Sequence, residues 1–445
     1  MTRSGLWRDR DLWAGLLAAA PLVIFPFSRA YTICFLLILA VALVANRRPG
    51  PWLRHPGLLL AGAATGLPIL LTMVVAGFRR GGIDGLWVEK LALVGVAALV
   101  GLAVALLLDG ARARRVAALV ITATVALWVV DGLVQLLAGR DLFGVPLANE
   151  VGGPPRVRSF FSKSTRYSYF VGFLLIPPAF WLLGRPRGRL PACLLVACGA
   201  AAVFAAGSRY AMAGYGLFMI VFVAVVARAL PKRPRVALLV GAPVALLSLV
   251  ALMYFSNDSF RTRLDQTAVV LEQFDRETVN RALSMRLDVW EPAVEMIAER
   301  WAFGWGPSEF ERQVGAYLDA DSPFAGETRI MHAHQVGIEV LLATGLVGLG
   351  AFLAYYAWLT RTLWLRRERA ASFGWGCLLA YLLLWFPLGS QKDFYGSEQV
   401  LVSFYLLGLG FACLAGEGAA TRMERPGVTG EQAKYEESGD DFDTA

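Results

Sequence analysis

Two histidines, His332 and His334, stand one residue apart directly before a long apolar run that begins at Val336. An imidazole is the side chain best matched to accepting a proton near neutral pH. This position predicts a titratable ring at the outer mouth of a membrane helix, where it could act as a general base. The alternative interpretation is a histidine that only caps the helix at the membrane interface.

Two arginines are the other candidates for chemistry. Arg209 stands in a very short connection between two apolar runs, where a charge is costly unless it is paired or lines a polar cavity. Snorkelling of its side chain to the outer headgroups is the alternative. Arg286 precedes Trp290 by four residues, a spacing that places both on one face of a helix. The alternative there is an exposed arginine beside a packing tryptophan.

The composition indicates the class of protein that must position these side chains. The chain has 445 residues, 57% of them hydrophobic, and a mean hydropathy of +0.55, well above a soluble domain. The net charge of +8 comes from Lys and Arg that lie mainly in short connections between apolar runs. That distribution sets membrane topology and does not form a nucleic-acid-binding face. All five cysteines lie inside apolar runs, so we expect no disulfide and no thiol chemistry.

The fold class is therefore predicted as an all-α polytopic membrane protein. Twelve transmembrane helices are expected, at 11–27, 29–46, 57–77, 88–108, 114–137, 167–184, 190–207, 210–229, 235–255, 335–360, 371–389 and 396–416. The short connections that are rich in Arg and Lys all fall on the side of the N-terminus. By the positive-inside rule, both termini are expected in the cytoplasm.

Two long connections, 138–166 and 256–334, are expected on the outer side of the membrane. The larger one mixes charged and aromatic residues, and it is predicted to be folded and partly helical. We predict one transmembrane domain at 1–416 that includes the periplasmic loop 256–334. The remainder, 417–445, is expected to be a disordered, acidic, cytoplasmic tail.

With these residues and elements, nearly the whole chain resembles the O-antigen ligases and the related O-antigen polymerases. The shared signature is His, then Asn, Ser or Gln, nine residues, Gly, two residues, and Gly, Thr or Tyr. Its fixed positions are matched by His334, Gln335, Gly345 and Gly348. The family also carries an arginine at the outer end of a mid-chain helix and another four residues before a tryptophan in the large periplasmic loop. Arg209 and Arg286 match these two positions.

The resemblance implies a glycosyltransferase with a C-type, membrane-embedded fold in the bacterial inner membrane. Its donor would be a glycan on undecaprenyl diphosphate, and its acceptor a sugar hydroxyl of lipid A–core. Arg209 and Arg286 would hold the diphosphate, since a guanidinium can grip phosphate oxygens through two hydrogen bonds. His334 would take the proton of the acceptor hydroxyl, with inversion at the anomeric carbon. No metal and no cofactor are expected, and the active site would face the periplasm.

Several side chains are expected to support this site. His332 could assist or substitute for His334, and Glu339, one helical turn further on, could orient the imidazole or satisfy a neighbouring polar group. The basic residues of the shorter outer connection could form a rim for diphosphate or core phosphates, with contact to interfacial lipid as the alternative. These residues are Arg156, Arg158 and Lys163.

A metal site is not expected. Asp319 and Asp321 have the spacing of a carboxylate pair, but Asp9 and Asp11 repeat it on the cytoplasmic side, so we interpret both as chance. The only histidines are His55, His332 and His334, and two of them are separated by one residue, so a His-rich metal site is not expected.

Three alternatives to ligation stay open. A polymerase would use the same donor with a lipid-linked glycan as acceptor, and a protein O-oligosaccharyltransferase would use a protein. A transporter or lipid flippase is a different class, which would place charges near the bilayer midplane on broken helices. The candidate charges here cluster at the outer mouth instead, which favours an enzyme.

Overall fold

The computed structural model describes residues 9–26, 30–46, 50–80, 82–148, 155–283, 285–318, 322, 324, 332–387, 389 and 393–423. Helices dominate, and the described residues contain no β-strand, only isolated bridges that join Arg140 to Pro146 and Ala148 to Arg156. The predicted all-α class is confirmed.

The first part of the chain forms a series of mostly long apolar helices. They are α2 (Arg10–Ile24), α3 (Tyr31–Ala45), η1 (Gly50–Arg54), α4 (Pro56–Arg80), α5 (Gly85–Leu107), α6 (Ala111–Ala138), α7 (Ser164–Leu174), α8 (Ile176–Leu183), α9 (Arg189–Ala206), α10 (Arg209–Arg228) and α11 (Lys232–Ser256). The connection between α6 and α7, residues 139–163, is named the short connection below.

The long connection, residues 257–335, joins α11 to α16 and is itself partly helical, as predicted. It contains α12 (Asp258–Glu272), α13 (Arg276–Ala282), α14 (Leu287–Glu299), α15 (Glu309–Gln313) and η2 (Val314–Ala316). The chain continues through α16 (Val336–Leu365), η3 (Arg367–Arg369), α17 (Phe373–Leu384) and α18 (Ser397–Met423). The expected tail therefore begins inside α18, and its residues 424–445 lie outside the described ranges.

Every predicted transmembrane range contains a helix, but not all of these helices are long enough to span a bilayer. Nine spans in the described part of the chain have the required length and hydropathy, with α7 and α8 counted as one. A span needs about 20 apolar residues, whereas α2 and α3 have 15 each and α17 has 12. The polytopic class is thus confirmed, while the count of twelve stays a prediction.

The end of α17 differs from the predicted span 371–389. The helix stops at Leu384, and the chain then passes through Pro387 and Gly389 in a non-helical path. Proline lacks the N–H for a helical hydrogen bond and disfavours helical backbone in the residue before it. Phe386 and Gly389 are therefore available to line a site.

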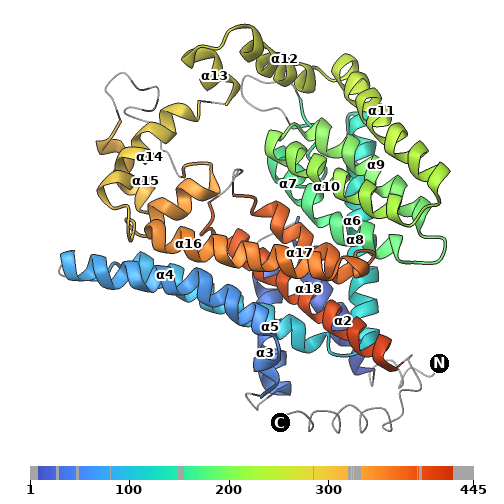
Figure 1. Ribbon diagram of the computed structural model, residues 1–445, viewed down its shortest axis with the longest axis horizontal. Helices are drawn as coiled ribbons and strands as arrows, with labels where there is room; N and C mark the ends of the chain where they lie inside the picture. Colours follow the sequence, from blue (N-terminus) through green and yellow to red (C-terminus); the bar gives the residue numbers. More distant parts are fainter. Residues whose placement is uncertain are drawn as a thin grey trace, which may run out of the picture.

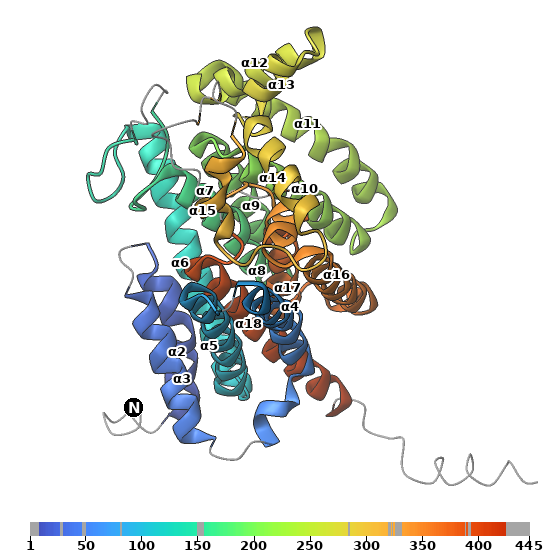
Figure 2. The same cartoon turned by 90° about the vertical axis from the view of Figure 1, so that its left-hand side faces the viewer.

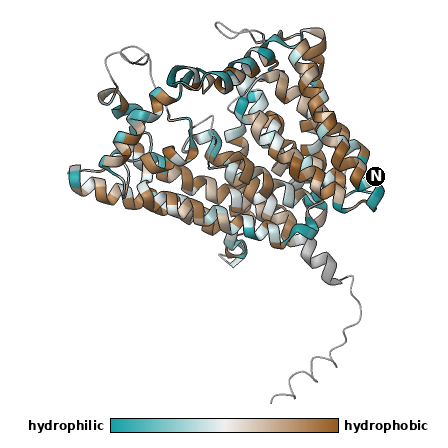
Figure 3. Ribbon diagram, turned by 45° about the horizontal axis from the view of Figure 1, so that its top comes forward, coloured by the Kyte–Doolittle hydropathy of each residue, from teal (hydrophilic) through white to brown (hydrophobic). Residues whose placement is uncertain are grey.

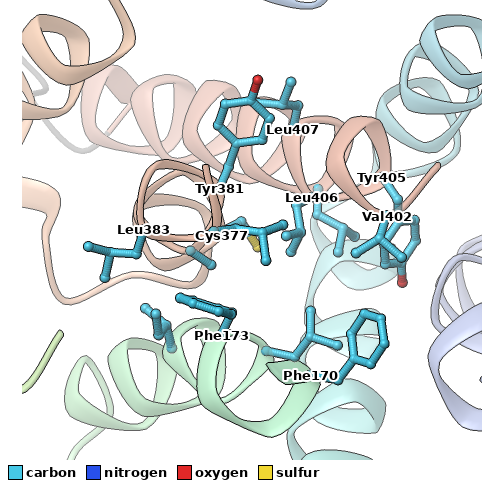
Figure 4. Close-up of a cluster of buried hydrophobic side chains, with 14 of the residues drawn as sticks. Phe170, Phe173, Cys377, Tyr381, Leu383, Val402, Tyr405, Leu406 and Leu407 are labelled. Atoms are coloured by element: carbon cyan, nitrogen blue, oxygen red, sulfur yellow. The ribbon is translucent and has the colours of Figure 1, made fainter. Parts of the chain in front are cut away.

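The helices pack into one bundle, in which α18 lies along α5, α2 along α6, and α17 contacts both α8 and α18 (Figures 1 and 2). Rings and aliphatic side chains from α7, α17 and α18 fill one part of the core, including Phe173, Cys377 and Leu406 (Figure 4). Hydrophobic residues predominate along the long helices, and hydrophilic ones gather towards the connections (Figure 3).

The long connection has a small hydrophobic core of its own. Side chains of α14, α15 and the segments beside them pack together and against Ala333 and Leu342. The core residues of the connection are Val289, Ala293, Met296, Trp305, Phe310 and Val314. Because Leu342 belongs to α16, this core fixes the connection onto the helix that follows His334.

A break in α16 completes this attachment. Gly345 adopts φ +63° and ψ −162°, which is not helical, and the backbone groups released there bond to residues 301–306. The four hydrogen bonds join Trp305 N to Leu342 O (2.7 Å), Gly306 N to Ala343 O (3.0 Å), Leu346 N to Trp301 O (2.8 Å) and Val347 N to Ala302 O (3.2 Å). The backbones of α16 and residues 301–306 therefore approach closely, and the cause is the broken helix.

Replacing Gly345 with Ala should detach residues 301–306 from α16. Its φ and ψ are accessible essentially only to glycine, at a cost of about 1–3 kcal/mol for other residues. A Cβ would also lie 2.3 Å from the carbonyl carbon of Ala302. We expect a lower thermal unfolding temperature in detergent and faster proteolysis within the long connection.

Gly350→Ala is the matched control, because Gly350 lies in the same helix and a Cβ there meets nothing within 4 Å. If both variants unfold at the wild-type temperature and resist protease equally, the attachment does not depend on the break.

Candidate functional site

Arg209 is the first residue of α10 and is turned towards the protein. Ser208 caps this helix by accepting a hydrogen bond from Ala211 N. The Arg209 guanidinium donates to the Ala282 carbonyl and, at 2.9 Å, to Gln266 Oε1, both in the long connection. The Arg209 side chain therefore does not extend towards the lipid headgroups, because it is bonded to groups of α12 and α13.

Arg286 is the residue that precedes α14, and Trp290 lies one turn later. Burial, reinforced by repulsion from Arg209, lowers the pKa of the Arg286 guanidinium. Arginine nevertheless keeps its charge at neutral pH, since its ordinary pKa lies above about 12. Within the described part of the chain, the Arg286 side chain has no hydrogen bond and no ion pair. The charge is thus left available for an anion.

The segment that carries His334 is held from three sides. The Trp290 indole donates to the Ala333 carbonyl at 2.9 Å. Gln335 caps α16 by accepting from Ile338 N, and its amide donates to Pro387 O at 2.7 Å. His334 itself has φ +56°, a left-handed conformation that is uncommon outside glycine. The backbone on both sides of this strained residue is therefore fixed.

Glu339 acts on the backbone of this segment. Its carboxylate accepts a hydrogen bond from Phe394 N at 2.7 Å, and the backbone N–H of His334 faces the same group. Glu339 is 7% exposed. It therefore joins the start of α16 to the chain that precedes α18, which is closest to the expected role of satisfying neighbouring polar groups.

One cavity of about 470 Å³ brings the three main candidates together. Arg209, Arg286 and His334 all line it, with Arg156 as a further basic residue. The rest of the lining is Thr165, Gly207, Ser208, Tyr210, Ala213, Gly214, Leu217, Ala282, Leu283, Leu383, Phe386 and Gly389. None of these described lining residues is Asp or Glu. Three guanidiniums without a lining carboxylate make a positive cavity that is suited to an anion with several oxygens.

The supporting candidates lie elsewhere. The rings of His332 and His334 are 3.9 Å apart between centroids, but His332 does not line the cavity. Trp290, Gln335 and Glu339 also stand behind the lining and hold its backbone. Of the predicted basic rim, Arg156 lines the cavity, whereas Arg158 and Lys163 do not.

Gln135 organises the short connection, which carries all three of these basic residues. Gln135, fully buried in α6, uses its amide oxygen to accept from Arg158 N and Ser159 N, both at 2.7 Å. Its amide nitrogen donates to the carbonyls of Val145 and Pro146. Sequence reasoning did not single out Gln135. The signal was present, because a polar side chain inside an apolar run is costly unless it has a function.

In the described part of the chain, no three His, Cys, Asp or Glu side chains are grouped closely enough to hold a metal ion. Asp319 and Asp321 lie outside the described residues, so the interpretation of their spacing as chance stays a prediction.

Comparison with known families now bears on this cavity. Residues 194–353 match the O-antigen ligase family model. The matched segment runs from α9 into α16 and contains Arg209, Arg286 and His334, so the resemblance predicted from the sequence is confirmed over these residues. The O-antigen ligase match supports a membrane glycosyltransferase-like enzyme of the ligase and polymerase type. A search of curated proteins finds no match.

Trp290→Phe should loosen the segment that carries His334 while keeping an aromatic ring in place. The substitution leaves the carbonyl of Ala333, a fully buried residue, without the indole N–H, a loss of about 1–3 kcal/mol. We expect diethyl pyrocarbonate to modify His334 faster in this variant, as measured by mass spectrometry. The control is Trp301→Phe, since Trp301 lies in the same connection and is 59% exposed. Equal modification rates in the two variants would mean that the indole bond does not hold the segment.

Proposed function

We propose that this chain is an O-antigen ligase that transfers a glycan from undecaprenyl diphosphate to a sugar hydroxyl of lipid A–core. It would act in lipopolysaccharide biosynthesis, without a metal, and with inversion at the anomeric carbon. The observation that carries this proposal is the single cavity lined by Arg209, Arg286 and His334.

The charge of the cavity suits the donor's diphosphate. Two guanidiniums can bind phosphate oxygens through parallel hydrogen bonds and stay charged at any physiological pH. Arg286 has no hydrogen-bond or ion-pair partner among the described residues. No Asp or Glu is among the described residues that line the cavity, and a diphosphate would supply a counter-charge to Arg286.

The imidazole of His334 suits the other half of the reaction. The acceptor hydroxyl oxygen would attack the anomeric carbon as His334 accepts its proton. The bond from that carbon to the diphosphate oxygen would break, and the electron pair would leave with the lipid diphosphate. A single displacement of this kind inverts the anomeric carbon and needs no metal, because the arginines stabilise the departing charge.

The proposed location follows from the donor and from the distribution of charge. A lipid diphosphate is an activated leaving group that is already in the bilayer, where the polytopic fold places the enzyme. The Arg- and Lys-rich short connections favour cytoplasmic termini, which puts the long connection and the cavity on the periplasmic side of the inner membrane.

His334→Ala should abolish transfer while leaving the protein in the membrane. Loss of a general base costs about 10²–10⁴-fold in rate. The measurement is transfer from a purified undecaprenyl-diphosphate glycan by detergent-solubilised, monodisperse protein. His332→Ala should be milder, because His332 does not line the cavity. Near-wild-type transfer by His334→Ala would remove the base assignment.

Substitutions of Arg209 and Arg286 should separate the effect of losing the positive charge from the effect of losing the planar guanidinium, which can donate two parallel hydrogen bonds. Lys at either position keeps the charge but cannot make two parallel hydrogen bonds, so partial activity should survive. Ala removes both, and each Ala variant should lose about 10²–10³-fold in rate. Wild-type rates in both Ala variants, measured in the same transfer assay, would show that neither arginine binds the leaving group.

A lipopolysaccharide gel from a deletion strain tests the acceptor. Loss of a ligase leaves lipid A–core without O-chain, while polymer accumulates on the lipid carrier. Core that bears one repeat unit would instead identify a polymerase. Unchanged lipopolysaccharide with loss of glycosylated protein would identify a protein O-oligosaccharyltransferase.

A further inference from the structure

A groove lies between α10 and α16, at the end of the bundle away from the cavity that His334 lines. Its volume is about 330 Å³, within the range of about 300–1,000 Å³ that small-molecule sites occupy. We propose that this groove, named the α10–α16 groove below, binds an anionic phospholipid. The lipid phosphate would contact Arg228 and Arg367, and an acyl chain would lie against the apolar floor. This binding site goes beyond the proposed glycan transfer and does not depend on it.

The walls and floor of the α10–α16 groove suit an acyl chain. Helix α17 contacts both α10 and α16 and forms the floor between them. Apart from the two arginines and Thr360, the described lining is apolar or aromatic. It includes Ile220, Val221 and Val225 on α10, and Trp375, Leu379 and Leu382 on α17. Such a surface gains free energy when a hydrocarbon chain fills it.

The two arginines stand at the level expected for lipid headgroups. Arg228 is the last residue of α10, and Arg367 lies two residues after the end of α16. Both helices have the length and hydropathy of a membrane span. Helix α10 has 20 residues, so its ends are about 30 Å apart, the thickness of the hydrocarbon core. Arg228 is therefore across the membrane from Arg209, at the end that the proposed orientation assigns to the cytoplasm.

The charge of the groove favours an anion. Both guanidiniums belong to exposed residues, and neither makes an ion pair with another described residue. Arg367 donates to the Trp364 carbonyl at 3.0 Å and lies over the indole ring, while Arg228 makes no hydrogen bond within the described part of the chain. No Asp or Glu is among the described lining residues, since Glu368, which follows Arg367, does not line the groove. Two like charges that face one groove attract a phosphate.

The glycan donor does not supply this anion. Its diphosphate would lie near Arg209, at the other end of α10, and a free phosphate would leave the apolar floor uncovered. A phospholipid matches both features, because its phosphate and acyl chain are joined at the membrane surface. Trp364, 61% exposed beside the arginines, adds an indole of the kind that is enriched at headgroup level. Basic pockets between helices at the cytoplasmic surface recognise anionic headgroups in this way.

Native mass spectrometry of the full-length protein in detergent tests the charge requirement. The probes are dioleoylphosphatidylglycerol, which is anionic, and dioleoylphosphatidylcholine, which has the same chains but no net charge. Arg228→Gln combined with Arg367→Gln removes both guanidiniums of the groove. The matched control combines Arg361→Gln with Arg366→Gln, which removes the same charge from exposed residues that do not line the groove.

A second pair of variants tests the apolar part of the groove. Ala224 lines it and is exposed, so Ala224→Trp would fill the space with an indole while keeping both arginines. Ala357→Trp is the control, because it adds the same side chain at an exposed position of α16 outside the groove.

Wild-type protein should bind phosphatidylglycerol more tightly than phosphatidylcholine. Loss of both groove arginines should weaken phosphatidylglycerol binding at least about tenfold, since each basic residue near a membrane phosphate contributes about fivefold. The paired control at Arg361 and Arg366 should bind it nearly as wild type. Ala224→Trp should lose binding and Ala357→Trp should keep it. Phosphatidylglycerol should also raise the unfolding temperature of the wild type but not of the variant that lacks both groove arginines, because a ligand of the folded state stabilises that state.

Several results would overturn the inference. They are equal phosphatidylglycerol binding by the two double Gln variants, equal affinity of the wild type for both lipids, and wild-type binding by Ala224→Trp. Displacement of phosphatidylglycerol by undecaprenyl diphosphate would assign the groove to the donor's tail, and a dimer that Ala224→Trp abolishes would assign it to a second copy of this chain. Glycan transfer, measured on the same preparations, bears on the proposed function alone, so the failure of one proposal is distinguishable from the failure of the other.

Discussion

The break of α16 at Gly345 is the constraint on which the candidate site depends. A continuous helix would have used the backbone groups of residues 342–347 internally, and residues 301–306 would have had nothing to bond to. Since α14 precedes those residues, the break also positions Arg286 and Trp290. The break at Gly345 therefore attaches the long connection to α16, the helix that begins two residues after His334. This attachment brings Arg286 and His334 to the same cavity.

The second constraint is electrostatic. Arg156, Arg209 and Arg286 share one cavity of about 470 Å³ with no carboxylate among its described lining residues. Gathering like charges costs free energy, and burial adds a desolvation cost. The packing that surrounds them, from Gln135 in α6 to the attachment of the long connection, offsets that cost. Under the proposed function, a diphosphate bound in the cavity would lower that cost further.

Much of the fold and the main residues of the site could be predicted from the sequence. Apolar runs of about 20 residues are set by the thickness of the bilayer, so the helices α4 to α11, α16 and α18 were located in advance. Arg209 and His334 were visible because a charged or titratable side chain at the end of an apolar run is costly. Arg286 was visible because it precedes Trp290 by four residues, about one helical turn. The predictions failed where the outcome depended on tertiary hydrogen bonds. Arg156 and Arg158 look alike in sequence, but in the folded short connection only Arg156 lines the cavity.

The same limit applies to the residues around His334. Sequence spacing indicated that Trp290 shares a helix face with Arg286, but not that its indole binds the Ala333 carbonyl, a residue distant along the chain. Such bonds matter because a positive φ at His334 is unfavourable and persists only when neighbouring groups fix the backbone. Trp290, Gln335 and Glu339 fix it from three elements, the long connection, the segment after α17 and the residues before α18. With the backbone of His334 fixed in this way, the proposed general base would lose less freedom when substrate arrives, so the side chains behind the cavity would contribute to the proposed chemistry together with those that line it.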